Sequence, residues 1–600
     1  MTVSLRIAIL VKQIPAVQEM RLDSNGRLRR EGLTTELNAY CRRAVAKAVE
    51  LVAEYGGECV VLTLGPPNAE EVLRESIAWA HMHDVRMTGV HACDPRFAGS
   101  DTLATANALA AVLRREGPFD LVLIGRASLD ADTGQVGPQI AELLRLPFAT
   151  AVREFSYAPD TSTISVRCEH DDGSVRATVT LPAVVSAAER LIAPCKVVPE
   201  GRAAVAGELI RTVTAAELGQ GPWGQAGSPT RVGPTRVHSA RRTKHILSGP
   251  IQDQVAEAIT RLIARGALRS DNPPALTEAV PARQPGSASG APIAVVLEPD
   301  RPRVARELLC AAAKIANQIG GHVVALGPGL PSAESLGAWG ADKAIGFTGS
   351  TIEEDLARGI ATWAQHDTPQ IMLIPSTAWG REIAGRVAAR LAAGLVGDSV
   401  DLELHDGRLV AWKPAFGGQL VAAVISTSDL QMATVRAGAL PLAAPRRYTA
   451  ELTHHALTSM GGIEIIDRYR DDDLDILEEA LTVIGIGAGV SAQDHERLVP
   501  LQKILGAELA ATRKVTDRGE LPRARQIGIT GRSIAPRLYI ALGISGKFNH
   551  SVGVRRAQTV LAVNSDPSAP IFDSADIGVV GDWRAAVDAL IPALEATGGL

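Results

Sequence analysis

The chain has 600 residues, 46% of them hydrophobic and 21% charged, which is the composition of a globular protein of several domains. Its 66 acidic and 61 basic residues leave a net charge of −5, without the clustered basic surplus that nucleic-acid binding needs. No stretch approaches the roughly 20 apolar residues of a membrane span. The six cysteines lie far apart with no Cys-x-x-Cys pair and are expected to be reduced thiols, so we expect a cytoplasmic protein that is not embedded in a membrane.

Short apolar runs alternate with amphipathic helical stretches from the first residues onward. Strands are predicted at 7–11, 60–64 and 121–124, and helices at 42–55 and 69–80. This alternation is typical of a parallel sheet with helices on both faces. Alternating polar and apolar residues on either side of Asp171–Gly173 predict a β-hairpin. The expected fold class is α/β, with doubly wound parallel sheets.

The pattern weakens after about Thr214, and Ser270–Gly290 contains four prolines with serine and glycine, a composition that predicts a linker without a packed core. The α/β pattern restarts near residue 293. Its strand, loop and helix at 370–391 resemble those at 120–144, which indicates duplication and fusion. We predict two related domains and a Rossmann-like C-terminal domain, with these boundaries: 1–266 including a C-terminal arm, a linker at 267–290, 291–478 and 479–600.

Four loops bearing glycine or asparagine recur within the last 120 residues: Gly485–Gly489, Gly528–Gly531, Gly543–Gly546 and Val563–Asp566. Three of them directly follow apolar runs predicted to be strands. Loops at the carboxyl edge of a parallel sheet form the crevice where ligands bind, and glycine allows a backbone to approach pyrophosphate closely. The loops therefore predict one large polyphosphate ligand.

Several of these segments resemble the FAD-domain signature of the electron transfer flavoprotein α subunit: Gly543–His550, Val563–Pro567, Ala569–Phe572 and Ala575–Gly578. The first half resembles the β subunit of the same family at Val11–Pro15, Leu37–Asn38, Leu64–Pro66, Gly125–Gly137 and Leu181–Val185. The resemblance covers residues 1 to about 266 and 291–600. It implies two related adenine-nucleotide-binding-type domains followed by a domain that binds FAD.

By this resemblance, Arg513 lies beside the isoalloxazine ring, Thr530 at its N5 edge and His550 near its pyrimidine oxygens. A cation at that place raises the potential of a bound flavin. Residues 526–530 and 545–550 are implied to line the pyrophosphate and the ring, and Asn564 and Asp576 to lie toward the adenosine. The remaining implied FAD contacts are Thr512, Gln526, Ile527, Gly528, Ile529, Gly543, Ser545, Gly546, Lys547, Phe548 and Asn549.

Two alternatives stay open for single residues of this set. In one, Arg513 is an ordinary surface arginine. In the other, His550 is a core histidine whose hydrogen bonds are all made within the protein. The chain also departs from the family at Ala488, where an arginine is frequent, and at Ile529, where glutamine is usual. Both changes remove polar contacts to the cofactor and bear on flavin affinity and potential rather than on FAD binding itself.

A second nucleotide site is predicted in the first half, where an acidic loop leads directly into a helix. Hydroxyl and N–H donors at a helix N-terminus suit phosphate. The alternative is a plain helix start with Asp132 or Thr133 as its N-cap. By resemblance the ligand is AMP or a second FAD, held by Leu10, Asn38, Leu64, Gly125, Asp130, Asp132, Thr133, Gly134, Gln135 and Val136.

The resemblance implies a single-chain electron carrier rather than an enzyme with its own substrate. It accepts electrons on FAD from partner dehydrogenases and passes them to an acceptor such as a membrane quinone reductase. The segment Arg190–Pro199 lacks the Ile-Met-Lys-Ala anchor of the family's partner-recognition loop, so the usual acyl-CoA dehydrogenase partner is not assured. Two alternatives remain: an electron-bifurcating, NADH-linked flavoenzyme with two FADs, and an adenine-nucleotide sensor without redox function.

Overall fold

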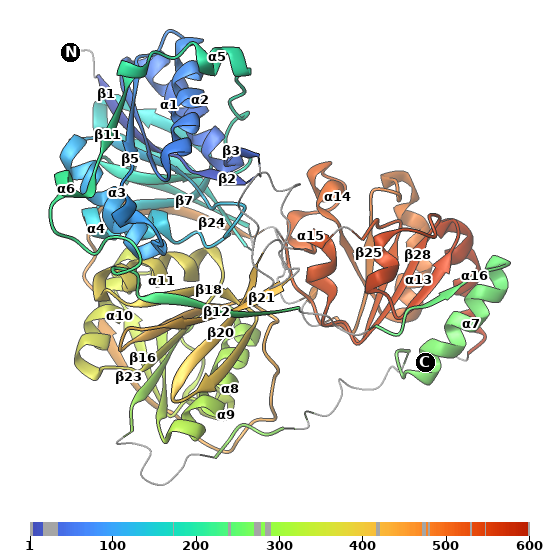
Figure 1. The fold of residues 1–600 in the computed structure, drawn as a ribbon. Coiled ribbons are helices and arrows are strands. Elements are labelled where there is room, and N and C mark those ends of the chain that lie inside the picture. The colour runs from blue at the N-terminus through green and yellow to red at the C-terminus, as the bar shows by residue number, and fades with distance from the viewer. Residues whose placement is uncertain are drawn as a thin grey trace.

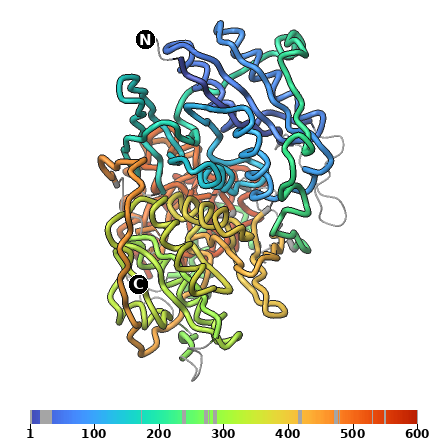
Figure 2. Tube along the Cα trace, turned by 90° about the vertical axis from the view of Figure 1, so that its left-hand side faces the viewer, coloured from blue at the N-terminus to red at the C-terminus, as the bar shows by residue number. Residues whose placement is uncertain are grey.

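Three sheets with separate apolar cores organise the chain into a first domain (5–213), a second domain (292–456) and a C-terminal domain (480–597), as Figure 1 shows. The first domain lies above the second in a side view, and the C-terminal domain lies behind their junction (Figure 2). The computed structural model describes residues 4–15, 34–171, 173–237, 242–268, 276, 278–282, 290–415, 420–470, 476–477, 480–528, 531–546 and 548–597. Among these, no helix is long and apolar enough to cross a bilayer.

The first domain contains the strands and helices that the apolar pattern predicts. Ile7 and Ile9 of β1 are fully buried, because helices cover both faces of the parallel part of the sheet. The strands run in the order β11-β5-β4-β1-β6-β10-β7-β8-β9, and the predicted hairpin is formed by β8 and β9. The strands are β1 Leu5–Leu10, β4 Gly57–Leu64, β5 Met87–Ala92, β6 Leu121–Gly125, β7 Phe148–Ala158, β8 Thr163–His170, β9 Gly173–Thr180, β10 Ala183–Ala187 and β11 Ile210–Val213. The main helices are α1 Ala39–Tyr55, α2 Glu70–His81, α3 Thr102–Glu116 and α4 Val136–Leu144.

The second domain repeats this topology strand by strand. Its order is β23-β16-β15-β14-β17-β22-β18, followed in a separate sheet by β19-β20-β21. The single strand β7 of the first domain corresponds to β18 and β19, which Val400 separates. The strands are β14 Pro292–Val296, β15 His322–Pro328, β16 Lys343–Thr348, β17 Ile371–Pro375, β18 Gly394–Ser399, β19 Asp401–His405, β20 Arg408–Ala415, β21 Leu420–Ser426, β22 Gln431–Val435 and β23 Glu451–Ala456. The helices are α8 Pro302–Ile319, α9 Ala333–Trp339, α10 Glu353–Asp367 and α11 Ala378–Leu391.

The two related domains exchange edge strands. Strand β12 (Thr230–Val237), which follows the first domain, pairs antiparallel with β21 of the second. Strand β24 (Ile463–Arg470), which follows the second domain, pairs antiparallel with β9 of the first. Each domain therefore covers an open sheet edge of the other, and the chain cannot be cut into two independent halves without exposing both edges.

The C-terminal domain has a parallel sheet in the order β26-β25-β27-β28-β29, which confirms the α/β class for this part as well. Its strands are β25 Thr482–Ile486, β26 Glu508–Ala511, β27 Leu538–Leu542, β28 Thr559–Asn564 and β29 Ile577–Val580. Its helices are α13 Val499–Leu505, α14 Arg513–Asp517, α15 Phe548–Ser551 and α16 Trp583–Glu595.

The arm predicted at the end of the first half is part of this C-terminal sheet. Strand β13 (His245–Leu247) pairs parallel with β29 at the sheet edge, and α7 (Ile251–Ala264) packs against α16 (Figure 1). The Gln254 amide exchanges two hydrogen bonds with the backbone of Val580, at 2.9 and 3.0 Å. Residues 242–268 therefore pack with the C-terminal domain. The domain boundaries given above remain predictions.

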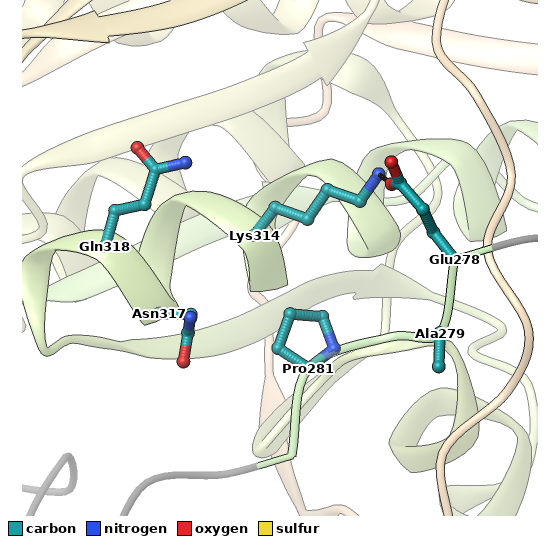
Figure 3. A pocket seen from close by; sticks show the side chains of 6 residues that line it. All are labelled: Glu278, Ala279, Pro281, Lys314, Asn317 and Gln318. Atoms are coloured by element: carbon teal, nitrogen blue, oxygen red, sulfur yellow. Dashed lines mark hydrogen bonds and ion pairs between the residues drawn. The ribbon is translucent and has the colours of Figure 1, made fainter.

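Most of the predicted linker lies outside the described residues, but 278–282 differ from the expectation that this segment packs against nothing. Val280 is buried at 3% exposure, and its N–H donates to the Ala444 carbonyl at 2.8 Å. Glu278 forms an ion pair with Lys314 of α8, beside a shallow surface hollow that Figure 3 shows from close by. Pro281 lines this hollow, and Val280 is part of the apolar core of the second domain, which composition alone did not indicate.

Candidate functional site

The order of strands in the C-terminal sheet defines one crevice. In chain order the sheet reads 2-1-3-4-5, so the chain leaves β25 in one direction along the sheet and returns to β27 on its other side. The loops that follow β25 and β27 consequently diverge, and ligands of open α/β sheets bind at such a switch point. Those loops are two of the glycine loops predicted from the sequence.

The two loops approach each other closely through their backbones. The Gly489 N–H donates to the Gly543 carbonyl at 3.3 Å, and a Cβ at Gly487 would lie 2.1 Å from that same oxygen. Gly543 and Gly546 have φ of 59° and 74°, in the left-handed region that glycine adopts without cost. Only glycines let the two loops come this close, because a Cβ at Gly487 or Gly546 would collide with neighbouring backbone.

The neighbouring loops are held in place by side chains of the predicted set. Asn564, which ends β28, donates to the Ile544 carbonyl and accepts from the Asp566 N–H, both at 2.9 Å. Ser545 is exposed in the loop after β27. Thr512 is the N-cap residue of α14, without a capping hydrogen bond from its side chain, and Arg513 is the first residue of that helix. These four predicted contacts therefore lie at the carboxyl edge of one sheet, as the sequence analysis expected.

In the first domain, the loop between β6 and α4 is fixed from several sides. The buried Asn38 amide donates to the Ala127 carbonyl at 2.9 Å and accepts from the Leu129 N–H at 3.2 Å. Lys12 reaches both carboxylate oxygens of Asp130 at 2.8 Å. Burial by itself would raise the pKa of Asp130, but Lys12 and Ser128 outweigh it and leave that pKa lowered. Leu10, Leu64 and Gly125 end the strands β1, β4 and β6 beside this loop.

The N-terminus of α4 carries no side-chain cap. Its N-cap residue is Gln135, which makes no capping hydrogen bond, so the alternative of Asp132 or Thr133 as N-cap is wrong. Gln135 is 1% exposed, and its Oε1 accepts from Thr102 at 2.7 Å. Its Nε2 has no hydrogen-bond partner among the residues that the structure describes. Positive φ at Asp132 (46°) and Gly134 (64°) turns the chain toward Val136, the first residue of α4. No N-cap side chain accepts a hydrogen bond from the N–H groups at this helix start.

The comparisons with known proteins bear on both sites. A family model described as the electron transfer flavoprotein domain matches residues 26–218 and again 300–460, together more than half of the chain. The chain belongs to the electron transfer flavoprotein family. A second model, the electron transfer flavoprotein FAD-binding domain, matches 476–555, the part that contains the switch-point crevice. The double match of the first model agrees with the repeated sheet topology of the first two domains.

Individual relatives match about half of this flavoprotein chain. Protein FixB of Clostridium saccharobutylicum is 33% identical over 306 residues, which are 48% of this chain and 91% of the relative. The electron transfer flavoprotein subunit alpha of Mycobacterium tuberculosis H37Rv is 35% identical over 306 residues, 50% of this chain and 95% of its own length. Neither relative therefore accounts for the whole of this longer chain.

His550, which was predicted to contact the flavin, has hydrogen-bond partners inside the protein. It is buried, with Nε2 2.7 Å from the Tyr539 hydroxyl and Nδ1 3.3 Å from the Ile527 carbonyl. Burial lowers the pKa of His550 to about 4 and raises that of Tyr539, so both are neutral. A neutral imidazole has one donor and one acceptor, and both are used inside the protein. This is the arrangement of the alternative, a histidine satisfied within the core.

Asp576 also lies elsewhere than expected. It precedes β29, at the amino edge of the sheet and opposite the glycine loops, where it accepts from the Val560 N–H at 2.9 Å. Arg242 and Arg265 of the arm reach the same carboxylate at 2.8 and 3.0 Å. With 2% exposure and all of these partners, Asp576 anchors the arm rather than the adenosine.

Three predicted contacts, Ile529, Thr530 and Lys547, lie outside the described residues, as do the side chains of Phe548 and Asn549. Gln526 and Ile527 are buried. The side-chain amide oxygen of Gln526 accepts a hydrogen bond from the Thr516 hydroxyl at 2.9 Å, which holds this loop against α14. Gly528, with φ of 132°, turns the chain beside them. This segment lies beside β26, where Gln526 forms an isolated parallel bridge with Ala511, and Arg513, which follows β26, is partly exposed.

The residues that join the sites of the different domains were not predicted from the sequence. Glu189, two residues beyond β10, forms an ion pair with Arg513. Glu169 of β8 accepts from Arg523 at 3.1 Å, and Lys413 of the second domain donates to the Ala131 carbonyl at 2.8 Å. No local sequence signal marks these contacts between domains, because each of them joins residues more than 280 positions apart in the chain.

Proposed function

We propose that this chain is a single-chain electron transfer flavoprotein that accepts electrons from partner dehydrogenases and passes them to an acceptor such as a membrane quinone reductase. The crevice between the glycine loops after β25 and β27 supports this most directly, since it lies within the part matched by the FAD-binding model. FAD held there supplies the ability to take up and release electrons one or two at a time. The protein supplies the cradle for the pyrophosphate and a cation, Arg513, at the rim.

The loop 126–135 supports a second nucleotide in the first domain. Its uncapped helix N-terminus and the unpartnered, buried amide of Gln135 present donors suited to a phosphate. AMP and FAD fit this argument equally. Two FADs would favour the second candidate function, electron bifurcation linked to NADH.

Nucleotide content decides between these functions. We expect acid release and chromatography to yield one FAD per chain plus one further adenine nucleotide. One FAD and one AMP, with no absorbance change on adding NADH, support a plain carrier. Two FADs, one of them bleached by NADH, support the bifurcating enzyme. A chain that binds no FAD contradicts the proposed function, and FAD alone contradicts the second site.

Arg513→Ala is expected to leave FAD bound and to lower its reduction potential, because a positive charge that favours the reduced, more negative flavin is removed. For a partly exposed charge we expect about 1 kcal/mol, or roughly 20 mV for a two-electron couple. Redox titration against a reference dye measures the shift. Arg518→Ala is the matched control, since Arg518 is also exposed and pairs with Glu520 at 3.3 Å. Equal potentials for wild type and R513A would place Arg513 away from the flavin.

A further inference from the structure

Ion pairs connect the first domain to the C-terminal domain beside the crevice. Arg513 pairs with Glu189, and Arg523 with Glu169 at 3.1 Å. Arg190 lies 3.8 Å from Asp517. Figure 1 shows α14, which begins at Arg513, on the side of the C-terminal domain that faces the first domain. A rim residue of the predicted FAD site is therefore held by a carboxylate from another domain.

Glu189 is well placed to hold a cation. Its side chain is 25% exposed, and its backbone is fixed because Arg43, whose guanidinium also bonds the Ala39 carbonyl at 2.9 Å, donates to the Glu189 carbonyl. Burial by itself would raise the pKa of Glu189, but the hydrogen bond and charge of Arg513 outweigh it and lower that pKa. Glu189 is consequently an anion at neutral pH.

Arg513 has a second ion-pair partner, which does not connect the two domains. Asp517 lies 3.2 Å from the Arg513 guanidinium but belongs to the same helix, α14. An (i, i+4) pair of this kind is present wherever that helix is. Glu189 is the partner that fixes the guanidinium relative to the first domain.

We infer that Glu189 is a positioning residue that holds the Arg513 guanidinium toward the first domain, and thereby sets the reduction potential of the flavin from another domain. The inference rests on the proposed function, because it needs FAD beside Arg513. The carboxylate draws the guanidinium toward the first domain, so the ring feels less of its positive charge and reduction is less favourable. Loss of the carboxylate charge has the opposite sign to loss of Arg513.

The test compares E189Q, R513A and the double variant by redox titration of the FAD-loaded protein. E189Q is expected to shift the equilibrium with a reference dye about two- to tenfold toward reduced flavin. In the R513A background the same change is expected to have a clearly smaller effect, because Glu189 acts through the arginine. E169Q is the matched control: it weakens the pairs of Glu169 with Arg523 and Arg126 and leaves the Arg513–Glu189 pair in place, so the dye equilibrium should stay within twofold of wild type.

A second measurement needs no flavin. In FAD-free protein, the shifts of the urea midpoint caused by E189Q and R513A are expected to be non-additive, which reports the pair itself. Glu189→Asp, which keeps the charge, replaces E189Q if the latter does not fold, and should shift the potential less than R513A.

The outcomes separate the inference from the function on which it rests. A potential that moves in R513A but not in E189Q overturns the role of Glu189 and leaves the proposed function standing. Equal effects of E189Q with and without Arg513 show a direct effect of its charge and also overturn the positioning role. If the wild-type chain does not bind FAD, the proposed function itself is wrong, and the inference about Glu189 is wrong with it.

Discussion

Replacing Asp576 with alanine is expected to lower the free energy of unfolding of the C-terminal domain by about 3–5 kcal/mol. The carboxylate is 2% exposed and accepts from Arg242, Arg265 and the Val560 N–H. Its loss leaves the Arg242 guanidinium, whose side chain is 7% exposed, buried without its main charge partner. Because the arm completes the sheet edge, FAD release and unfolding in urea should both shift to lower denaturant.

Asp573→Asn provides the control for that experiment. Asp573 lies three residues earlier and pairs with Lys244 of the same arm at 3.0 Å, but both side chains are exposed. Exposed pairs contribute about 0–1 kcal/mol, so this variant should unfold almost as the wild type does. Equally large losses in D573N and D576A would mean that burial does not distinguish the two carboxylates, and the anchoring role would be wrong.

Arg386→Met is expected to destabilise the packing of the first domain on the second, also by about 3–5 kcal/mol. The Arg386 side chain is 1% exposed in α11, where that helix packs against α4. It lies 3.3 Å from Glu382, 3.5 Å from Glu142 and 3.8 Å from Glu354. Methionine keeps much of the volume but leaves these carboxylates without their central cation.

The destabilisation by R386M should grow with pH. Burial raises the pKa of Glu382 to about 8, against the opposing effect of Arg386. Between the unfolded value near 4.5 and about pH 8, the folded state keeps a proton that the unfolded state loses, so stability from Glu382 falls as pH rises. Without Arg386 the pKa of Glu382 in the folded state is higher still, so the decline of stability with pH extends to higher pH.

Thermal unfolding at pH 6 and pH 8.5 measures this dependence. Glu382→Gln should flatten the decline in the wild-type background, because the titrating group is gone. Arg390→Met is the matched control, since Arg390 also pairs with Glu142 but its side chain is 38% exposed. A loss in R386M that is the same at both pH values would contradict the assignment of the titration to this cluster.

The sequence alone determined the elements and the family. Apolar runs such as 7–11 and 121–124 became β1 and β6, because a short continuous apolar run bounded by turn or charged residues favours a strand covered on both faces. The glycine loops of the C-terminal domain were predictable for a similar reason: at Gly487 and Gly546 a Cβ would collide with neighbouring backbone, so the constraint is written into the residue itself. Both kinds of signal are local.

The tertiary structure decided which residues serve the site and which serve the framework. His550 and Asp576 belong to the family's motif, yet the fold places them against Tyr539 and Arg242, and their polar atoms are used there. Glu189 was not predicted because nothing near it in the chain indicates Arg513, 324 positions away. Hydrogen-bonding capacity and ion pairing depend on distances between atoms, and for residues this far apart in sequence only the folded arrangement of the domains sets those distances.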